Sequence, residues 1–275
     1  MTKVLSKDLT TYDFLKSIAV ILMVIDHIGF HFYPDEVWWR VFGRLCVPIW
    51  FFLIGYAKTR EIPKTFWLGA GILVLSSLLA GQYLFPLNIL FVLAAARFMI
   101  DGIALRALRT NETLAGMFFL LLLLSFPSMF IVEYGTMGLL FSLFGYMVRN
   151  PQAVPFKRFP VFVFISGTAL AYVVTQGSMM PKLSVDQFTV LMLGTIFVCM
   201  LLSAFQPLTF PRLTRILTPA GAGIFKIMGR HSLAVYVLHI LILRAVSVVM
   251  FPERFRFLEW TFFPREMAAY LESVF

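Results

Sequence analysis

The first long apolar stretch of the chain carries side chains that could do acid–base chemistry. Lys16 and His27 are 11 residues apart, so an α-helix would present both on one face, about 16 Å apart along its axis. Asp13 and His31 would lie within about 60° of that face, at 100° per residue. Ionisable groups at membrane depth are costly unless they face a partner or a cavity, so this polar stripe predicts a functional site.

Asp26 is expected to serve a different purpose from its neighbour His27. A helix turns adjacent side chains about 100° apart, so the two do not form a carboxylate–imidazole pair. The next helix carries Arg40 and Arg44 four residues apart on one face, and a turn at Pro34 would fold it back beside Asp26. The sequence predicts an Asp26–Arg44 ion pair that offsets the burial cost of both charges.

His27 would then be left as a base. An imidazole changes its protonation state near neutral pH and can take a proton from an amine or a hydroxyl. Guanidinium groups nearby could stabilise a developing oxyanion. A base and cations in a dry site suit acyl transfer from a thioester.

Two other functions use the same residues. A proton-coupled transporter could employ Asp26, His27 and Arg44 as a relay, although no inverted repeat is evident in the sequence. A metal site could use His27 and His31 with a nearby acid. It lacks an HExxH glutamate and further ligands at metal spacing, so no metal is expected.

The elements that must position these groups are those of a membrane protein. Apolar residues make up 60% of the 275 residues and charged residues 13%, against roughly 45–50% and 25% in ordinary globular domains. This composition excludes a cytosolic enzyme, a disordered chain and a disulfide-stapled domain. The net charge of +9 lies in short links between apolar runs, so no nucleic-acid partner is expected. Cys46 and Cys199 lie inside apolar runs and are expected to be packing residues.

Nine apolar runs are interpreted as membrane spans, on the criterion of about 20 residues each. They are 14–33, 38–57, 66–84, 87–105, 114–132, 135–149, 160–177, 187–205 and 232–251. The sequence therefore predicts an all-α polytopic membrane protein with about nine to ten transmembrane helices, as a single domain over 1–275. Pro and Gly interrupt 206–230, which is expected to form a cytoplasmic loop with a short interfacial helix. The mixed-charge segment 252–275 is expected to be an amphipathic or re-entrant tail.

Basic residues alternate between the predicted links. One set of links holds Lys3, Lys7, Lys58, Arg60, Lys64, Arg106, Arg109, Lys157, Arg158, Arg212, Arg215, Lys226 and Arg230. The opposite set holds little more than Arg40, Lys182 and the tail. The positive-inside rule therefore predicts a cytoplasmic N-terminus.

Five segments, in order along the chain, resemble the TraX family of membrane proteins, which is associated with N-terminal acetylation of conjugative pilin. They are LKSIAVILMVIDHIG from residue 15, GRLCVPIWFFLIG from Gly43, NILF from Asn88, EYGTMGLL around Tyr134, and VYVLHILIL around His239. The Lys16-x10-His27 spacing is also similar to the Arg-x10-His pattern of acyltransferase-3 proteins, with Lys in place of Arg.

The resemblance implies roles for the residues identified above. His27 would be the catalytic histidine, and Lys16 and Arg44 would be donor-binding or site-organising cations. Asp26 and Arg44 are therefore grouped with His27 as catalytic residues, and Arg40 is grouped with Lys16 as donor-binding. Lys16 also has a structural alternative as an anchor at the cytoplasmic headgroups.

Three further residues match motif positions and are grouped with the donor-binding residues, but each has a structural alternative. Asn88 could cap a helix, Tyr134 could be an interfacial aromatic, and His239 could be a core histidine.

The resemblance further implies an acetyltransferase of the bacterial inner (cytoplasmic) membrane that uses acetyl-CoA as its donor. The acceptor stays open among a protein N-terminus, a glycan and a lipid-linked amine or hydroxyl. His27 would lie about 16 Å outward of Lys16, in the outer half of a hydrocarbon core of about 30 Å. Transfer to an acceptor on the outer side is therefore expected.

Overall fold

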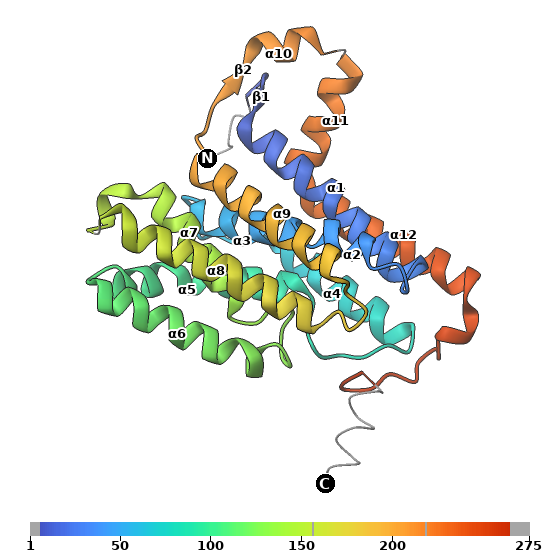
Figure 1. Cartoon of the computed structure of the whole chain (residues 1–275). Helices are drawn as coiled ribbons and strands as arrows, with labels where there is room; N and C mark the ends of the chain where they lie inside the picture. The colour runs from blue at the N-terminus through green and yellow to red at the C-terminus, as the bar shows by residue number, and fades with distance from the viewer. Residues whose placement is uncertain (1–5, 156, 218, 265–275) are drawn as a thin grey trace. The chain divides into compact units, whose positions relative to one another are not determined.

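The computed structural model describes residues 6–155, 157–217 and 219–264 (Figure 1). Its α-helices are α1 (Thr11–Phe32), α2 (Trp38–Gly43), α3 (Cys46–Tyr56), α4 (Lys64–Leu79), α5 (Ile89–Ala107), α6 (Asn111–Ser128), α7 (Met137–Arg149), α8 (Arg158–Ser178), α9 (Val185–Ser203), α10 (Pro211–Ile216), α11 (Pro219–Arg230) and α12 (Ser232–Met250). Two 3-10 turns, η1 (Pro151–Ala153) and η2 (Pro252–Arg254), and two short strands, β1 (Leu9–Thr10) and β2 (Thr209–Phe210), complete the described elements.

The predicted fold class, an all-α multi-pass membrane protein, is confirmed. Within the described residues, six segments are helical, long and apolar enough to cross a membrane: α1, α2 with α3, α6, α8, α9 and α12. The other predicted runs form α4 and α7, which are shorter, and α5, which carries Arg97, Asp101 and Arg106. The count of nine to ten spans is not confirmed, and the cytoplasmic N-terminus stays a prediction.

The chain divides into two compact units, each built from two separate stretches of sequence. The first takes its described residues from Met1–Trp50 and Lys182–His239, and the second from Phe51–Pro181 and Ile240–Phe275. The prediction of one domain over 1–275 stays a prediction. The residues of the polar stripe all belong to the first unit.

A capping box starts α1 at the residue where the polar stripe begins. The Thr10 hydroxyl accepts a hydrogen bond from the Asp13 backbone N–H at 3.2 Å, and the Asp13 carboxylate accepts one from the Thr10 N–H at 2.9 Å. Two N–H groups that the helix cannot satisfy internally are thereby paired. The box fixes where α1 begins and therefore which residues share each of its faces.

Glycines let two other helices approach α1 closely. A Cβ added to Gly43 of α2 would lie 2.3 Å from the Asp26 Cβ and 2.5 Å from its Cα. A Cβ added to Gly229 of α11 would lie 2.7 Å from the Asp13 Cα. Neither position has room for a side chain, so both contacts bring backbone against backbone beside an acidic residue of α1.

The segment 206–230 contains more structure than the predicted loop with one short helix. β2 pairs antiparallel with β1, with Leu9 opposite Phe210 and Thr10 opposite Thr209. α10 and α11 follow, and Figure 1 shows them beside the N-terminal end of α1. The strand pair satisfies backbone groups next to the capping box, which the helical periodicity could not indicate.

The described part of the predicted tail is irregular after η2. After η2, the Leu258 N–H donates to the Leu79 carbonyl at 3.2 Å, and the Phe85 N–H donates to the Phe262 carbonyl at 2.8 Å. Backbone hydrogen bonds to the end of α4 and to the α4–α5 link therefore hold this part of the chain. The amphipathic or re-entrant character of the tail stays a prediction. Residues 265–275 lie outside the described residues.

We expect Gly43→Ala to lower the free energy of unfolding by about 1–3 kcal/mol, because the added methyl must push α2 away from Asp26. Denaturant unfolding in micelles measures this change. Gly71→Ala in α4 is the matched control, since a Cβ there meets nothing within 4 Å. Its helix propensity should raise stability by up to about 1 kcal/mol. Equal effects of the two substitutions would contradict the close-packing argument.

Candidate functional site

Asp26 lies between the two arginines of the following helical segment. The Arg40 Nη1 is 2.9 Å from Asp26 Oδ2, and the Arg44 Nε is 3.5 Å from Asp26 Oδ1. The carboxylate is buried and the two guanidinium groups are mostly buried. The predicted Asp26–Arg44 pair is confirmed, and Arg40 is the closer partner. Arg40, expected to bind the donor, is thus held by Asp26 and by the Phe30 ring, 5.4 Å from its Cζ.

His27 is hydrogen-bonded to a second histidine from the other end of the chain. Its Nδ1 lies 2.8 Å from the Nε2 of His239, and the ring centroids are 4.9 Å apart. The His239 Nδ1 in turn lies 2.8 Å from the Val235 carbonyl oxygen, one turn earlier in α12. The buried Tyr236 ring also lies beside the pair, 6.2 Å from the His27 centroid.

These contacts determine where the protons sit when both rings are neutral. A carbonyl oxygen only accepts, so the His239 Nδ1 carries a proton and its Nε2 is an acceptor. His27 must therefore donate from Nδ1, which leaves the lone pair on its Nε2. The backbone of α12 thereby sets the tautomer of His27 through His239. Sequence reasoning proposed no partner for His27, because the two residues are 212 positions apart.

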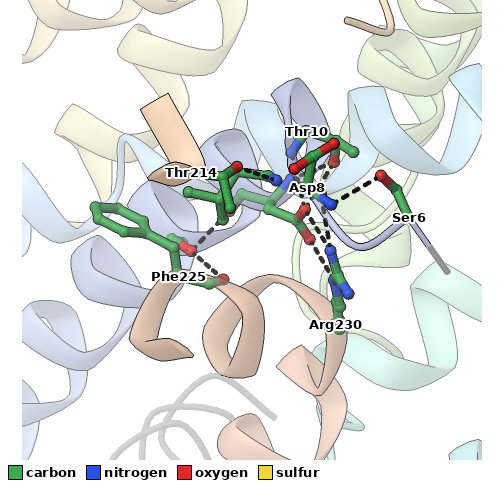
Figure 2. A network of polar contacts seen from close by, with 9 residues as sticks. Ser6, Asp8, Thr10, Thr214, Phe225 and Arg230 are labelled. Carbon is green, nitrogen blue, oxygen red and sulfur yellow. Dashed lines mark hydrogen bonds and ion pairs between the residues drawn. The ribbon is translucent and has the colours of Figure 1, made fainter. Parts of the chain in front are cut away.

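Asp13, at the start of the polar stripe, is engaged by α11. The Arg230 Nε lies 3.1 Å from Asp13 Oδ1, and its Nη2 lies 3.2 Å from Oδ2 and 3.1 Å from the Asp8 carbonyl oxygen. Figure 2 shows this network with the Phe225 carbonyl, which accepts from the Ser17 hydroxyl at 3.0 Å. The contacts fasten α11 to the first turns of α1, so we interpret Asp13 as a structural residue.

Different elements of the first unit therefore contact different polar residues of α1. Asp13 is bound by α11 and His27 by α12, while Asp26, on a neighbouring face, is bound by α2 and the residue after it. Lys16 is half-buried and His31 is buried. The role of Lys16 as a donor-binding cation stays a prediction.

Asn88 and Tyr134 belong to the second unit. The Asn88 Oδ1 accepts from the Leu90 N–H at 3.2 Å, so the residue is the N-cap of α5, the structural alternative given above. Tyr134 has a φ of 65° in the link before α7, and its ring packs edge-on against Phe51 at 6.0 Å. A donor-binding role for either residue stays a prediction.

Metal-ligating side chains are dispersed in the parts of the chain that the structure describes. No group of three or more His, Cys, Asp or Glu residues there could hold a metal ion.

Comparison with known proteins places the site in a family context. The family model described as TraX protein matches residues 11–247, which include both histidines of the pair. An uncharacterized protein, RP591 of Rickettsia prowazekii (strain Madrid E), is 26% identical over 159 residues. That match covers 54% of this chain and 60% of the relative's length. No solved structure matches significantly.

We expect Asp26→Asn to lower the free energy of unfolding by about 3 kcal/mol, because it leaves two mostly buried guanidinium groups without their counter-charge. The matched control is Asp35→Asn, which breaks the 2.5 Å pair with Lys182. The Asp35 side chain is 83% exposed, so this change should cost less than about 1 kcal/mol. Unfolding in micelles compares the two variants. A loss as small for Asp26→Asn as for the control would mean that the ion pairs do not stabilise the fold.

Proposed function

This chain belongs to the TraX family, and we propose that it is a membrane-embedded acyltransferase that moves an acetyl group from acetyl-CoA to an amine or hydroxyl acceptor. The observation that carries the proposal is the histidine pair. The 2.8 Å hydrogen bond to His239 orients His27 and leaves its Nε2 unprotonated. An oriented imidazole with a free lone pair is the group that acyl transfer to a weakly acidic nucleophile requires.

In the proposed reaction, His27 acts as a base and then as an acid. Its Nε2 takes the proton of the acceptor amine or hydroxyl as the acceptor nitrogen or oxygen attacks the thioester carbonyl carbon. The carbon–sulfur bond then breaks, and the departing thiolate receives the proton from His27. The acceptor leaves acetylated and CoA leaves as a thiol, so the enzyme returns to its starting protonation state.

The arginines beside Asp26 supply positive charge for this reaction. The carbonyl oxygen becomes negative in the tetrahedral intermediate, and cations fixed in advance stabilise such an oxygen without reorganising. Asp26, which immediately precedes His27 in the chain, holds Arg40 and Arg44 in place. In this proposal Asp26 is a positioning residue, and Arg44 acts with Arg40 rather than alone.

We place the donor in the cytoplasm and the acceptor on the outer side of a bacterial inner membrane. The basic links support a cytoplasmic N-terminus, and α1 then runs outward from Lys16 toward His27. The acceptor class is a protein N-terminus, a glycan or a lipid-linked group that carries an amine or a hydroxyl.

Sealed inverted vesicles supplied with labelled acetyl-CoA test the proposal, because their cytoplasmic face is exposed. We expect label on acceptors inside the vesicle, and a loss of about 100-fold or more in His27→Ala, as is typical when a general base is removed. His231→Ala, at an exposed histidine of the same unit, should transfer acetyl like the parent.

Three results would contradict parts of this proposal. Parent-like turnover by His27→Ala would remove His27 as the base. Label confined to the cytoplasmic face would contradict transfer across the membrane. If acetyl-CoA neither labels an acceptor nor raises the melting temperature of the purified protein, a proton-coupled transporter becomes the better hypothesis.

The role of His239 is tested by two substitutions that differ in hydrogen bonding. In His239→Gln the amide oxygen can accept from the His27 Nδ1–H, whereas His239→Leu removes the acceptor. We expect His239→Gln to keep kcat within about tenfold of the parent, and His239→Leu to lose about 100-fold with little change in KM. Equal losses in both would show that His239 does more than orient His27, and steady-state kinetics separates these outcomes.

A further inference from the structure

The segment 206–230 has an unusual charge balance. It contains four cations, Arg212, Arg215, Lys226 and Arg230, and its sequence has no Asp or Glu. Arg230 is used inside the first unit, where it binds Asp13. Arg212 and Arg215 are exposed and Lys226 is half-exposed. The surface of α10 and α11 therefore carries positive charge beyond what holds these helices to α1.

α11 has two apolar faces, and only one of them packs against α1. Gly229 is buried against the Asp13 backbone, and the Phe225 ring packs on Phe14 with centroids 5.0 Å apart. On the opposite side, at 100° per residue, lie Ile224 and Ile227, which are 56% and 57% exposed. The helix thus presents a second apolar face to its surroundings.

α10 also has an exposed apolar face with cations beside it. Leu213 and Ile216 are three residues apart and share a face, and Ile216 is 79% exposed. Arg212 and Arg215, each one position earlier, flank that face. Long cationic side chains beside exposed isoleucines can reach polar headgroups while the isoleucines enter the acyl boundary.

We propose that α10 and α11 form an in-plane docking surface for anionic phospholipid headgroups. The 12-residue α11 is too short to span a bilayer, so its exposed isoleucines can enter lipid only from the surface. The cations of this segment, which contains no acidic residue, complement the negative charge of an anionic leaflet. A soluble anion would account for the cations and leave the exposed isoleucines unexplained. This surface is separate from the proposed acyltransferase chemistry and stands without it.

Cysteine accessibility in lipid nanodiscs tests this surface. Ile224→Cys and Ile216→Cys are labelled with a polar maleimide in nanodiscs of phosphatidylcholine alone or with added phosphatidylglycerol. Gln206→Cys, an exposed polar position of the same segment, is the matched control, and the parent protein reports any labelling of the buried Cys46 and Cys199. We expect the two isoleucine positions to label about tenfold more slowly than residue 206 in anionic nanodiscs.

The charge requirement is tested in the same assay. Arg212→Glu with Arg215→Glu, or removal of phosphatidylglycerol, should restore most of the labelling rate. Labelling as fast as the control in anionic nanodiscs would overturn the proposal, and so would equal protection in both lipids. In detergent, acetyl-CoA or inorganic phosphate could slow labelling of the two isoleucine positions as much as anionic nanodiscs do. That result would mean that the segment binds a soluble anion instead of lipid. Protection in detergent that rises with protein concentration would indicate a second protein copy, and would also overturn the proposal.

Discussion

The polar side chains of α1 need partners, because the helix is otherwise made of apolar residues and is long and apolar enough to cross a membrane. An unpaired charge or hydrogen-bonding group at that depth is expensive, and hydrocarbon offers no substitute for water. The neighbours of α1 within its unit are placed accordingly. Asp13 pairs with Arg230, Asp26 pairs with Arg40 and Arg44, and His27 is hydrogen-bonded to His239.

Small residues make these pairings possible. The ion pairs form only if α2 and α11 come close enough for arginine side chains to meet carboxylates on α1. Gly43 and Gly229 remove the side chains that would hold the helices apart. Close backbone approach through small residues is also the general means by which membrane helices associate without a hydrophobic driving force. Packing and charge pairing therefore depend on one another at both ends of α1.

The three pairings serve different purposes. The Asp13–Arg230 network joins the start of α1 to α11, which at 12 residues is too short to span a bilayer, and so ties this short helix to the rest of its unit. The Asp26 pairs hold two cations in position. The histidine pair differs from both because it contains no fixed charge and leaves one ring nitrogen available. This contrast supports the proposal that His27 is the reacting base and that its neighbours position it.

Much of this could be predicted from the chain itself, because composition and local spacing carry the information. The apolar runs determine a helical membrane protein, and the i, i+4 arginines after the turn at Pro34 point to Asp26. Asn88 as a helix cap also follows from local chemistry. The partners of His27 and Asp13 could not be predicted this way. His239 and Arg230 lie more than 200 residues away in sequence, and periodicity within one helix says nothing about which distant helix packs against it. Only the tertiary structure decided that His27 meets a second histidine whose other nitrogen is bound to backbone, because that contact depends on how the first residues of α12, up to His239, pack within the first unit.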